Sequence, residues 1–350
     1  MSMSPGGTDG LSLDIAGAVG NSGMSLSGIV TEEPPRYPPS AVKKWLTCPA
    51  FWRLSQTWEP RAAQWTPHQS VGTAIHAGVA QFLRAHGNLA PSSQAVHDDP
   101  VREARRVLEE HYEPQETWAL DGLQALTEKG VKRLIRLLTE DILPGATVIA
   151  VEYPDPLQDP RCGTERLHRV IDCLLARGDG LEVWDWKSKI RLDAQYLGET
   201  ARATLHAWQL LDYAFHTQVW ARAGQFEPLI GCTGPVRHAA YGLVILGPKL
   251  MAQALPLTLT PARLAQWHRD ALVIWGQMAQ MDPRVPSVGR LAERPVVASS
   301  APVWHNWEAC TDRHLHFGKE CPFLPACHEL NGEEAQFGGL YRPIVREGGA

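Results

Sequence analysis

Apolar side chains recur at helical spacing in several segments of the chain. The clearest is VGTAIHAGVAQFLRAHG, residues 71–87, whose apolar stripe predicts a helix that ends near Gly87. The same spacing predicts a helix capped by Ser40, helical material over 101–112, a longer helix ending near Leu143, and helices over 199–222 and 261–281. The chain is therefore rich in amphipathic helices.

Shorter apolar runs predict strands between these helices. One strand runs from Thr147 in the segment ATVIAVEYP, and another covers residues 238–247, HAAYGLVILG. Two further runs flank the Gly-rich segment 176–180, which suits a tight hairpin. The resulting order is helix, strand, strand, strand, helix, strand, helix. This order is typical of an α/β fold with a mixed sheet flanked by helices.

The predicted hairpin, residues 167–189, carries polar groups in an unusual arrangement. If the Gly-Asp pair at 178–179 forms the turn centre, paired positions sum to 357, and Asp172 lies directly opposite Asp185. Opposed residues share a sheet face with β-carbons about 4.5–5.5 Å apart. Strand alternation places Lys187 on that face as well. Two acids and an amine on one patch favour a site for a cation, and a solvated hairpin face with a one-residue bulge is the alternative.

The helices contribute further candidate side chains. His76 lies off the apolar stripe of its helix, with small residues one turn away that leave the imidazole accessible to a large partner. Taken alone, it also fits a hydrogen-bonded histidine on a helix surface. Gln209 and Tyr213 lie four residues apart, so they share one face of their helix.

Composition and charge restrict the class of protein. The chain has 350 residues, 44% hydrophobic residues, 13 Trp and 20% charged residues, which is typical of a folded protein with a sizeable core. Its net charge of −5 means that any DNA contact depends on local patches or on bound metal ions. No apolar run approaches 18 residues and no export signal is evident, so we expect a cytoplasmic protein outside the membrane. Residues 1–36 are rich in Gly, Ser and Met and predict a disordered leader.

Seven cysteines, an odd number, argue against a disulfide framework and for thiols that are buried, reactive or metal-bound. Cys310, Cys321 and Cys327 fall within 18 residues of one another, and Cys48 is available as a fourth ligand. Cys48 and Cys321 are both followed by Pro, as in some iron–sulfur proteins. Zinc is the direct competitor, with four nearby histidines as possible ligands: His305, His314, His316 and His328. Buried thiols without a metal are the remaining alternative.

Five motifs in order resemble one nuclease family. They are SAVKKWLTCP with Cys48, GTAIH with His76, VID with Asp172, DWK with Asp185 and Lys187, and QLLDY with Gln209 and Tyr213. Over about residues 40–330, the chain resembles the RecB-like branch of the PD-(D/E)XK nucleases in its iron–sulfur version, represented by the AddB nuclease domain and the CRISPR-associated adaptation nucleases. The segment Cys321-x5-Cys327 is similar to the last cysteine pair of that family.

Two positions depart from the family pattern. The family usually places its second cluster cysteine two residues before the third, whereas ten residues separate Cys310 from Cys321 here. Asp185 also stands where many relatives carry Glu, a variant that preserves the carboxylate.

The resemblance implies a restriction-endonuclease-like core, a central mixed sheet flanked by helices. It implies a RecB-like nuclease domain over 37–330 with a helical insertion over 88–143, a cysteine cluster segment over 301–330, and a tail over 331–350.

The resemblance also implies a metal-dependent DNA nuclease, an exonuclease or end-processing enzyme in recombination, repair or replication. His76, Asp172 and Asp185 would ligate Mg²⁺ or Mn²⁺, and Lys187 would orient the attacking water. Gln209 and Tyr213 would position the DNA strand. Glu152 is either an outer carboxylate of the metal site or a strand-end charge. Four cysteines would hold a 4Fe-4S cluster, with zinc as the alternative: Cys48, Cys310, Cys321 and Cys327.

The implied partner is DNA, as single strands or duplex ends. The sequence has no GxxxxGK[ST] phosphate loop, so unwinding would require a separate helicase or recombination protein. The alternative function is a non-catalytic iron–sulfur subunit that binds DNA within a recombination complex.

Overall fold

The structure is a computed structural model. It describes residues 37, 39–60, 66–87, 99–112, 119–154, 170–189, 208–224, 226, 234–247, 250–281 and 341–343. The leader predicted over 1–36 and the cysteine segment predicted over 301–330 lie outside the described residues.

A five-stranded mixed sheet forms the centre of the structure. Its strands, in spatial order, are β2 (Thr147–Pro154), β3 (Val170–Arg177), β4 (Gly180–Lys189), β5 (Val236–Ile245) and β6 (Met251–Leu257). Strands β4 and β5 run parallel, and the other neighbours run antiparallel. This sheet confirms the predicted fold class. Strand β6 was not predicted from the sequence, because most of it is half-buried and shows no alternation of buried and exposed positions.

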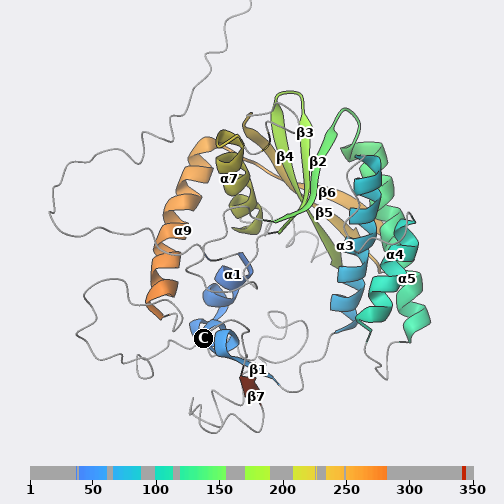
Figure 1. Cartoon of the computed structure of the whole chain (residues 1–350), viewed down its shortest axis with the longest axis horizontal. Coiled ribbons are helices and arrows are strands. Elements are labelled where there is room, and N and C mark those ends of the chain that lie inside the picture. Colours follow the sequence, from blue (N-terminus) through green and yellow to red (C-terminus); the bar gives the residue numbers. More distant parts are fainter. Residues whose placement is uncertain are drawn as a thin grey trace, which may run out of the picture.

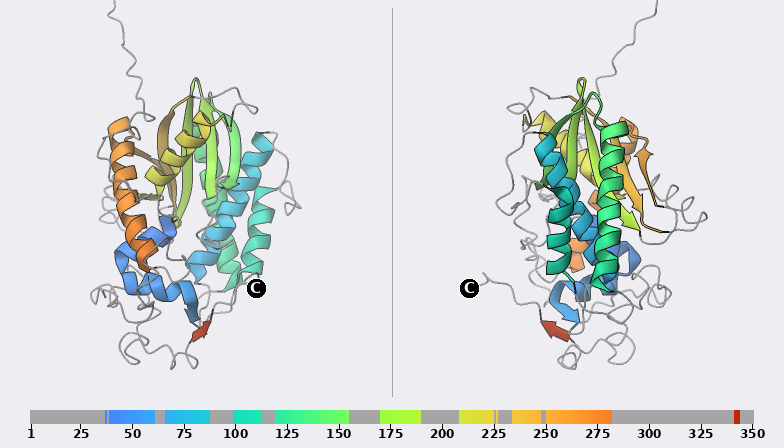
Figure 2. Two further views of the ribbon diagram at one scale, coloured as in Figure 1. Left: turned by 60° about the vertical axis from the view of Figure 1, so that its left-hand side comes forward. Right: turned by 90° about the vertical axis from the view of Figure 1, so that its right-hand side faces the viewer.

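Helices cover both faces of the sheet. Figures 1 and 2 show α3 (Pro67–His86), α4 (Pro100–Glu110) and α5 (Leu120–Leu137) on one side, and α1 (Pro39–Thr47), α7 (Trp208–Arg222) and α9 (Pro261–Met281) on the other. Each face buries its own apolar cluster. Alternation along β4 sends Val183 to the α7 side and Trp184 to the α3 side. Every second residue of β4 therefore faces α7, whereas β3 departs from this alternation at Asp172, since Ile171 lies in the cluster on the α7 side and Cys173 in the cluster on the α3 side.

The hairpin between β3 and β4 has the predicted register. Residues 178–179 form the turn, and Gly178 adopts a φ of 59°, a conformation that glycine accommodates without steric cost. Cys173 pairs with Trp184 and Leu174 with Val183, so paired positions sum to 357. The regular pairing ends at Cys173 with Trp184, next to Asp172 and Asp185.

Helix α3 begins four residues earlier than the apolar stripe indicated. Thr66 is its N-cap and forms a capping box with Gln69, in which each side chain accepts a hydrogen bond from the other residue's backbone N–H. Pro67 occupies the first turn, where its missing N–H costs nothing. The helix ends at Gly87, as predicted.

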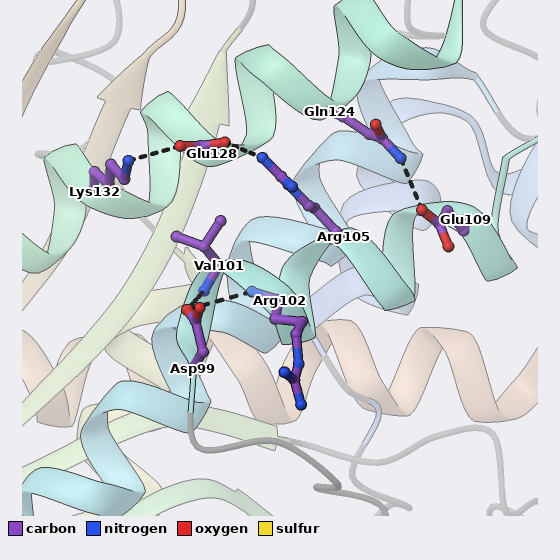
Figure 3. Close-up of polar contacts among 8 residues, drawn as sticks. All are labelled: Asp99, Val101, Arg102, Arg105, Glu109, Gln124, Glu128 and Lys132. Atoms are coloured by element: carbon purple, nitrogen blue, oxygen red, sulfur yellow. Dashed lines mark hydrogen bonds and ion pairs between the residues drawn. The ribbon is translucent and has the colours of Figure 1, made fainter.

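Helices α4 and α5 lie within the predicted insertion and pack against α3. Figure 3 shows the Asp99 side chain accepting hydrogen bonds from two backbone N–H groups at the start of α4. It also shows Glu128 of α5 paired with Arg105 of α4 and with Lys132 one turn along α5. The predicted helix end near Leu143 corresponds to a π-helical turn, Leu138–Ile142, that follows α5.

A second, two-stranded sheet joins distant parts of the chain. Strand β1 (Trp58–Pro60) follows α2 (Pro49–Thr57) and pairs with β7 (Tyr341–Pro343), which lies within the segment predicted as a tail. The pairing places this part of the C-terminal region beside the N-terminal helices (Figure 1). Within the described ranges, no helix combines the length and apolar character needed to cross a lipid bilayer.

Gly242 of β5 provides a test of packing between the sheet and Trp186. An added β-carbon at Gly242 would lie 2.4 Å from the buried Trp186 ring, whereas one at Gly276 of α9 would meet nothing within 4 Å. We expect Gly242→Ala to lower the free energy of unfolding by about 1–3 kcal/mol. Gly276→Ala should raise it by about 0.5–1 kcal/mol, because alanine favours a helix interior. Urea denaturation measures both, and equal effects would contradict the packing.

Candidate active site

Four predicted side chains lie together at one end of the hairpin. Asp172 comes from the start of β3, Asp185 and Lys187 come from the second half of β4, and His76 comes from the middle of α3. We refer to these four residues as the candidate active site. Strands β3 and β4 bring Asp172, Asp185 and Lys187 together, and α3 adds the imidazole from outside the sheet.

The Asp172 carboxylate links α3 to β4. Its Oδ2 atom lies 3.4 Å from Nδ1 of His76 and accepts a hydrogen bond of 2.7 Å from the backbone N–H of Trp186. The His76 side chain is 31% exposed and that of Asp172 is 14% exposed. The backbone hydrogen bond holds the carboxylate towards β4, and the imidazole remains accessible from solvent.

The Asp185 carboxylate is buried and has a partner on each oxygen. Its Oδ2 atom forms an ion pair with the Lys187 ammonium, and its Oδ1 atom accepts a 2.9 Å hydrogen bond from the Gln209 amide. The same amide nitrogen lies 3.0 Å from the Tyr213 hydroxyl, to which it donates. The structure therefore places the two residues predicted on one helix face, Gln209 and Tyr213, against the candidate active site.

Burial and the crowding of charges shift the acids in opposite directions. Burial raises the pKa of Asp185 to about 6, and the negative charge of Asp172 adds to this effect, although Lys187 opposes it. Burial alone would also raise the pKa of Asp172, but His76, Lys187 and the Trp186 N–H outweigh it and hold the pKa below its usual value. Asp172 is thus the acid that the surrounding protein keeps ionised.

The same carboxylates raise the pKa values of both bases. Burial alone would lower the pKa of Lys187, but Asp185 and Asp172 raise it above its ordinary value. Burial alone would likewise lower the pKa of His76, but the negative charges of Asp172 and Asp185 outweigh burial and raise it. Lys187 therefore stays a cation at neutral pH.

The donor set suits a divalent cation. Two carboxylates and an imidazole are ligands for Mg²⁺ or Mn²⁺, and the buried Asp185 Oδ2 has no hydrogen bond of good geometry in the described part of the chain. The donors are not yet gathered, however. Among the described residues, no three His, Cys, Asp or Glu side chains form a metal-binding group. A cation at this site would compete with Lys187 and Gln209 for the Asp185 carboxylate.

Glu152 lies beside Asp172 in the register of β2 and β3, between the pairs Val151 with Cys173 and Tyr153 with Ile171. Its φ of 50° is unusual for a residue with a side chain, and its carboxylate pairs with Arg84 of α3. Arg84 lies eight residues, or about two helical turns, beyond His76. The structure therefore supports a strand-end ion pair for Glu152.

Two neighbours of Lys187 were missed from the sequence. Tyr241 of β5 lies beside Asp185 in register, and its ring centroid is 5.4 Å from the Lys187 ammonium. Tyrosine within an apolar strand is usually a core residue, so the sequence offered no signal. Lys189 is the other neighbour. Partial burial lowers its pKa, and the positive charges of Lys187 and of Lys43 on α1 lower it further.

The described cysteines are buried. Cys48 lies at the junction of α1 and α2. Cys173 lies in β3 and packs into the apolar cluster on the α3 side, where burial raises the pKa of its thiol well above the usual value. Three predicted cluster ligands lie outside the described residues: Cys310, Cys321 and Cys327.

Comparison with known proteins adds one finding. The family profile of the PD-(D/E)XK nuclease superfamily matches residues 36–328, which include the whole candidate active site and all four predicted cluster cysteines. A search of curated proteins gives no significant match.

Metal binding at this site can be measured as a change in stability. A cation that binds the folded chain at about one hundred times its Kd adds about 2.7 kcal/mol, so we expect saturating Mn²⁺ to raise the Tm by about 4 °C. Asp172→Asn should abolish the rise because a ligand charge is lost. Asp179→Asn, at an 81% exposed position in the turn of the same hairpin, should retain it. An equal rise in all three proteins would place the cation elsewhere.

Proposed function

The chain belongs to the PD-(D/E)XK nuclease superfamily, and from this premise we propose that its candidate active site hydrolyses DNA with a divalent cation. Nucleases of this superfamily hydrolyse phosphodiester bonds. The observation that carries the assignment is the proximity of Asp172 and Asp185, whose charges interact, with Lys187 paired to Asp185 from two residues further along β4. Two neighbouring acids and an amine match what the chemistry requires.

His76, Asp172 and Asp185 would hold the cation, Mg²⁺ or Mn²⁺, and the imidazole favours Mn²⁺. When bound, the cation would polarise the phosphoryl oxygen and lower the pKa of a bound water. Asp172 is ready for this role because its pKa is held low and its carboxylate is fixed by the Trp186 N–H.

Lys187 would act as a cation that orients the attacking water and stabilises charge on the phosphate. Its side chain is 37% exposed, so it can reach a substrate. Its raised pKa keeps the ammonium protonated, which excludes it as a general base at neutral pH. Electrostatic stabilisation is the role that remains.

Gln209 would position Asp185 as well as the DNA strand. Its amide bridges the Asp185 carboxylate and the Tyr213 hydroxyl. Burial, with the negative charge of Asp185, raises the pKa of Tyr213, so its hydroxyl stays neutral. We infer that buried Tyr213 acts mainly through Gln209.

The substrate would be DNA, as single strands or duplex ends. Lys43 and Lys189 extend the positive charge of Lys187 along the end of β4, where a phosphate backbone would be attracted. With His76 among the site residues, we place the chain in the RecB-like branch, as an exonuclease or end-processing enzyme of recombination, repair or replication. A separate helicase or recombination protein would supply unwinding.

We also propose a structural 4Fe-4S cluster held by Cys48, Cys310, Cys321 and Cys327. Two observations support it. Cys48 is buried at the junction of α1 and α2, and the pairing of β1 with β7 brings the chain that follows Cys327 beside the chain that follows Cys48. Such a cluster would clamp the two ends of the domain together.

Lys187→Ala tests the catalytic assignment. With end-labelled linear single- and double-stranded DNA and Mn²⁺ or Mg²⁺, we expect the variant to cleave about 10²–10³-fold more slowly, because a preorganised charge is lost. Lys132→Ala, which removes an exposed lysine of α5 that is paired with Glu128, should leave the rate unchanged. Closed circular DNA should resist cleavage if the enzyme requires ends. A wild-type protein that binds DNA without cleaving it would instead support the alternative, a non-catalytic subunit that binds DNA.

Metal analysis of anaerobically purified protein tests the cluster. We expect iron and acid-labile sulfide in the wild type, and loss of both with a lower Tm in Cys48→Ser and Cys327→Ser. Cys173→Ser is the matched control, because this buried thiol is outside the proposed ligand set. The Cys173→Ser protein should therefore keep its iron and sulfide. Stoichiometric zinc without iron would contradict the cluster.

A further inference from the structure

Tyr241 lies against Lys187, the most exposed side chain of the candidate active site. Strands β4 and β5 run parallel with Asp185 beside Tyr241 in register, so both residues occupy the α7 side of the sheet. The Tyr241 ring is partly buried against the core on that side, and its centroid lies 5.4 Å from the Lys187 nitrogen. This distance is within the range of a cation–π interaction.

The Lys187 ammonium thus lies between two attractive groups, the Asp185 carboxylate and the face of the Tyr241 ring. The lysine stem has four rotatable bonds, and more than a third of the side chain is exposed. Without neighbours to hold it, such a side chain samples many rotamers. Each contact therefore restricts where the charge can be.

The two contacts differ in what they can do when a substrate is present. Asp185 is also a proposed cation ligand, and a carboxylate shared with a divalent cation attracts Lys187 less strongly. The ring has no such second role. Burial and the nearby Asp185 raise the pKa of Tyr241, so its hydroxyl stays protonated and the contact is made by a neutral aromatic face.

We propose that Tyr241 is a positioning residue that holds the Lys187 ammonium over its ring and directs it towards the scissile phosphate. The proposal rests on the proposed nuclease function. It identifies the ring face, not the hydroxyl, as the working part of Tyr241. Phenylalanine at this position should therefore serve as well as tyrosine, and leucine should not.

Single-turnover cleavage separates positioning from packing. We expect Tyr241→Leu to lower the cleavage rate constant about tenfold with DNA affinity unchanged, and Tyr241→Phe to stay within about twofold of the wild type. Tyr153→Leu is the matched control. It removes a partly buried ring from the same core, where it contacts Trp220 and Phe226 rather than Lys187, so it should lower the Tm without slowing cleavage by the folded protein.

A second readout does not depend on activity. Reductive ¹³C-methylation of the lysines keeps their positive charge, and the Lys187 signal is assigned by its absence from Lys187→Arg. We expect this signal to be shifted upfield by the ring current in the wild type and in Tyr241→Phe, and to move to the position of ordinary lysines in Tyr241→Leu.

The possible failures are distinguishable. If the wild type cleaves DNA and Tyr241→Leu cleaves equally fast, or if its Lys187 signal does not move, the positioning role is wrong while the nuclease assignment stands. A loss of activity in Tyr241→Phe equal to that in Tyr241→Leu would also overturn it, in favour of the hydroxyl. If the wild type does not cleave DNA, the proposed function fails, and the positioning role fails with it.

Discussion

Two neighbouring carboxylates of one hairpin are the constraint on which the candidate site depends. Asp172 and Asp185 repel each other in a largely buried place, and isolated charges there would be costly. Each neighbouring polar group offsets part of that cost: His76 and the Trp186 N–H at Asp172, Lys187 and Gln209 at Asp185. A divalent cation would relieve the remaining repulsion, so the arrangement suits a metal site.

Along β4, the sheet separates the polar side chains of the site from the packing that supports them. Trp184 and Trp186 point to the α3 side and join an apolar cluster, with Trp186 packed over Gly242. Asp185 and Lys187, the residues between and beyond them, face α7. A slip of one residue in register would exchange the two sets, burying the charges and exposing the tryptophans. The packing of the α3 side therefore fixes the polar side.

Local signals in the sequence were sufficient for the hairpin and several helices. Gly178 determined the turn and period-two alternation determined the register, so the neighbouring acids could be predicted. The end of α3 at Gly87 and the start of α9 after Thr260 followed from capping residues. Strand β6, the β1–β7 pair and the contact of Tyr241 with Lys187 could not be predicted, because each depends on pairing between segments with no local pattern. The rotamer of Asp185 likewise depends on α7, about 24 residues away at Gln209.

The most direct measurement is anomalous diffraction at the manganese edge from crystals grown with Mn²⁺. The account predicts a manganese peak ligated by His76, Asp172 and Asp185, with the Asp185 carboxylate rotated away from Lys187 and the Lys187 ammonium still over the Tyr241 ring. Full manganese occupancy elsewhere, with the ion pair between Asp185 and Lys187 intact, would contradict the claim that these four residues form a metal-dependent active site.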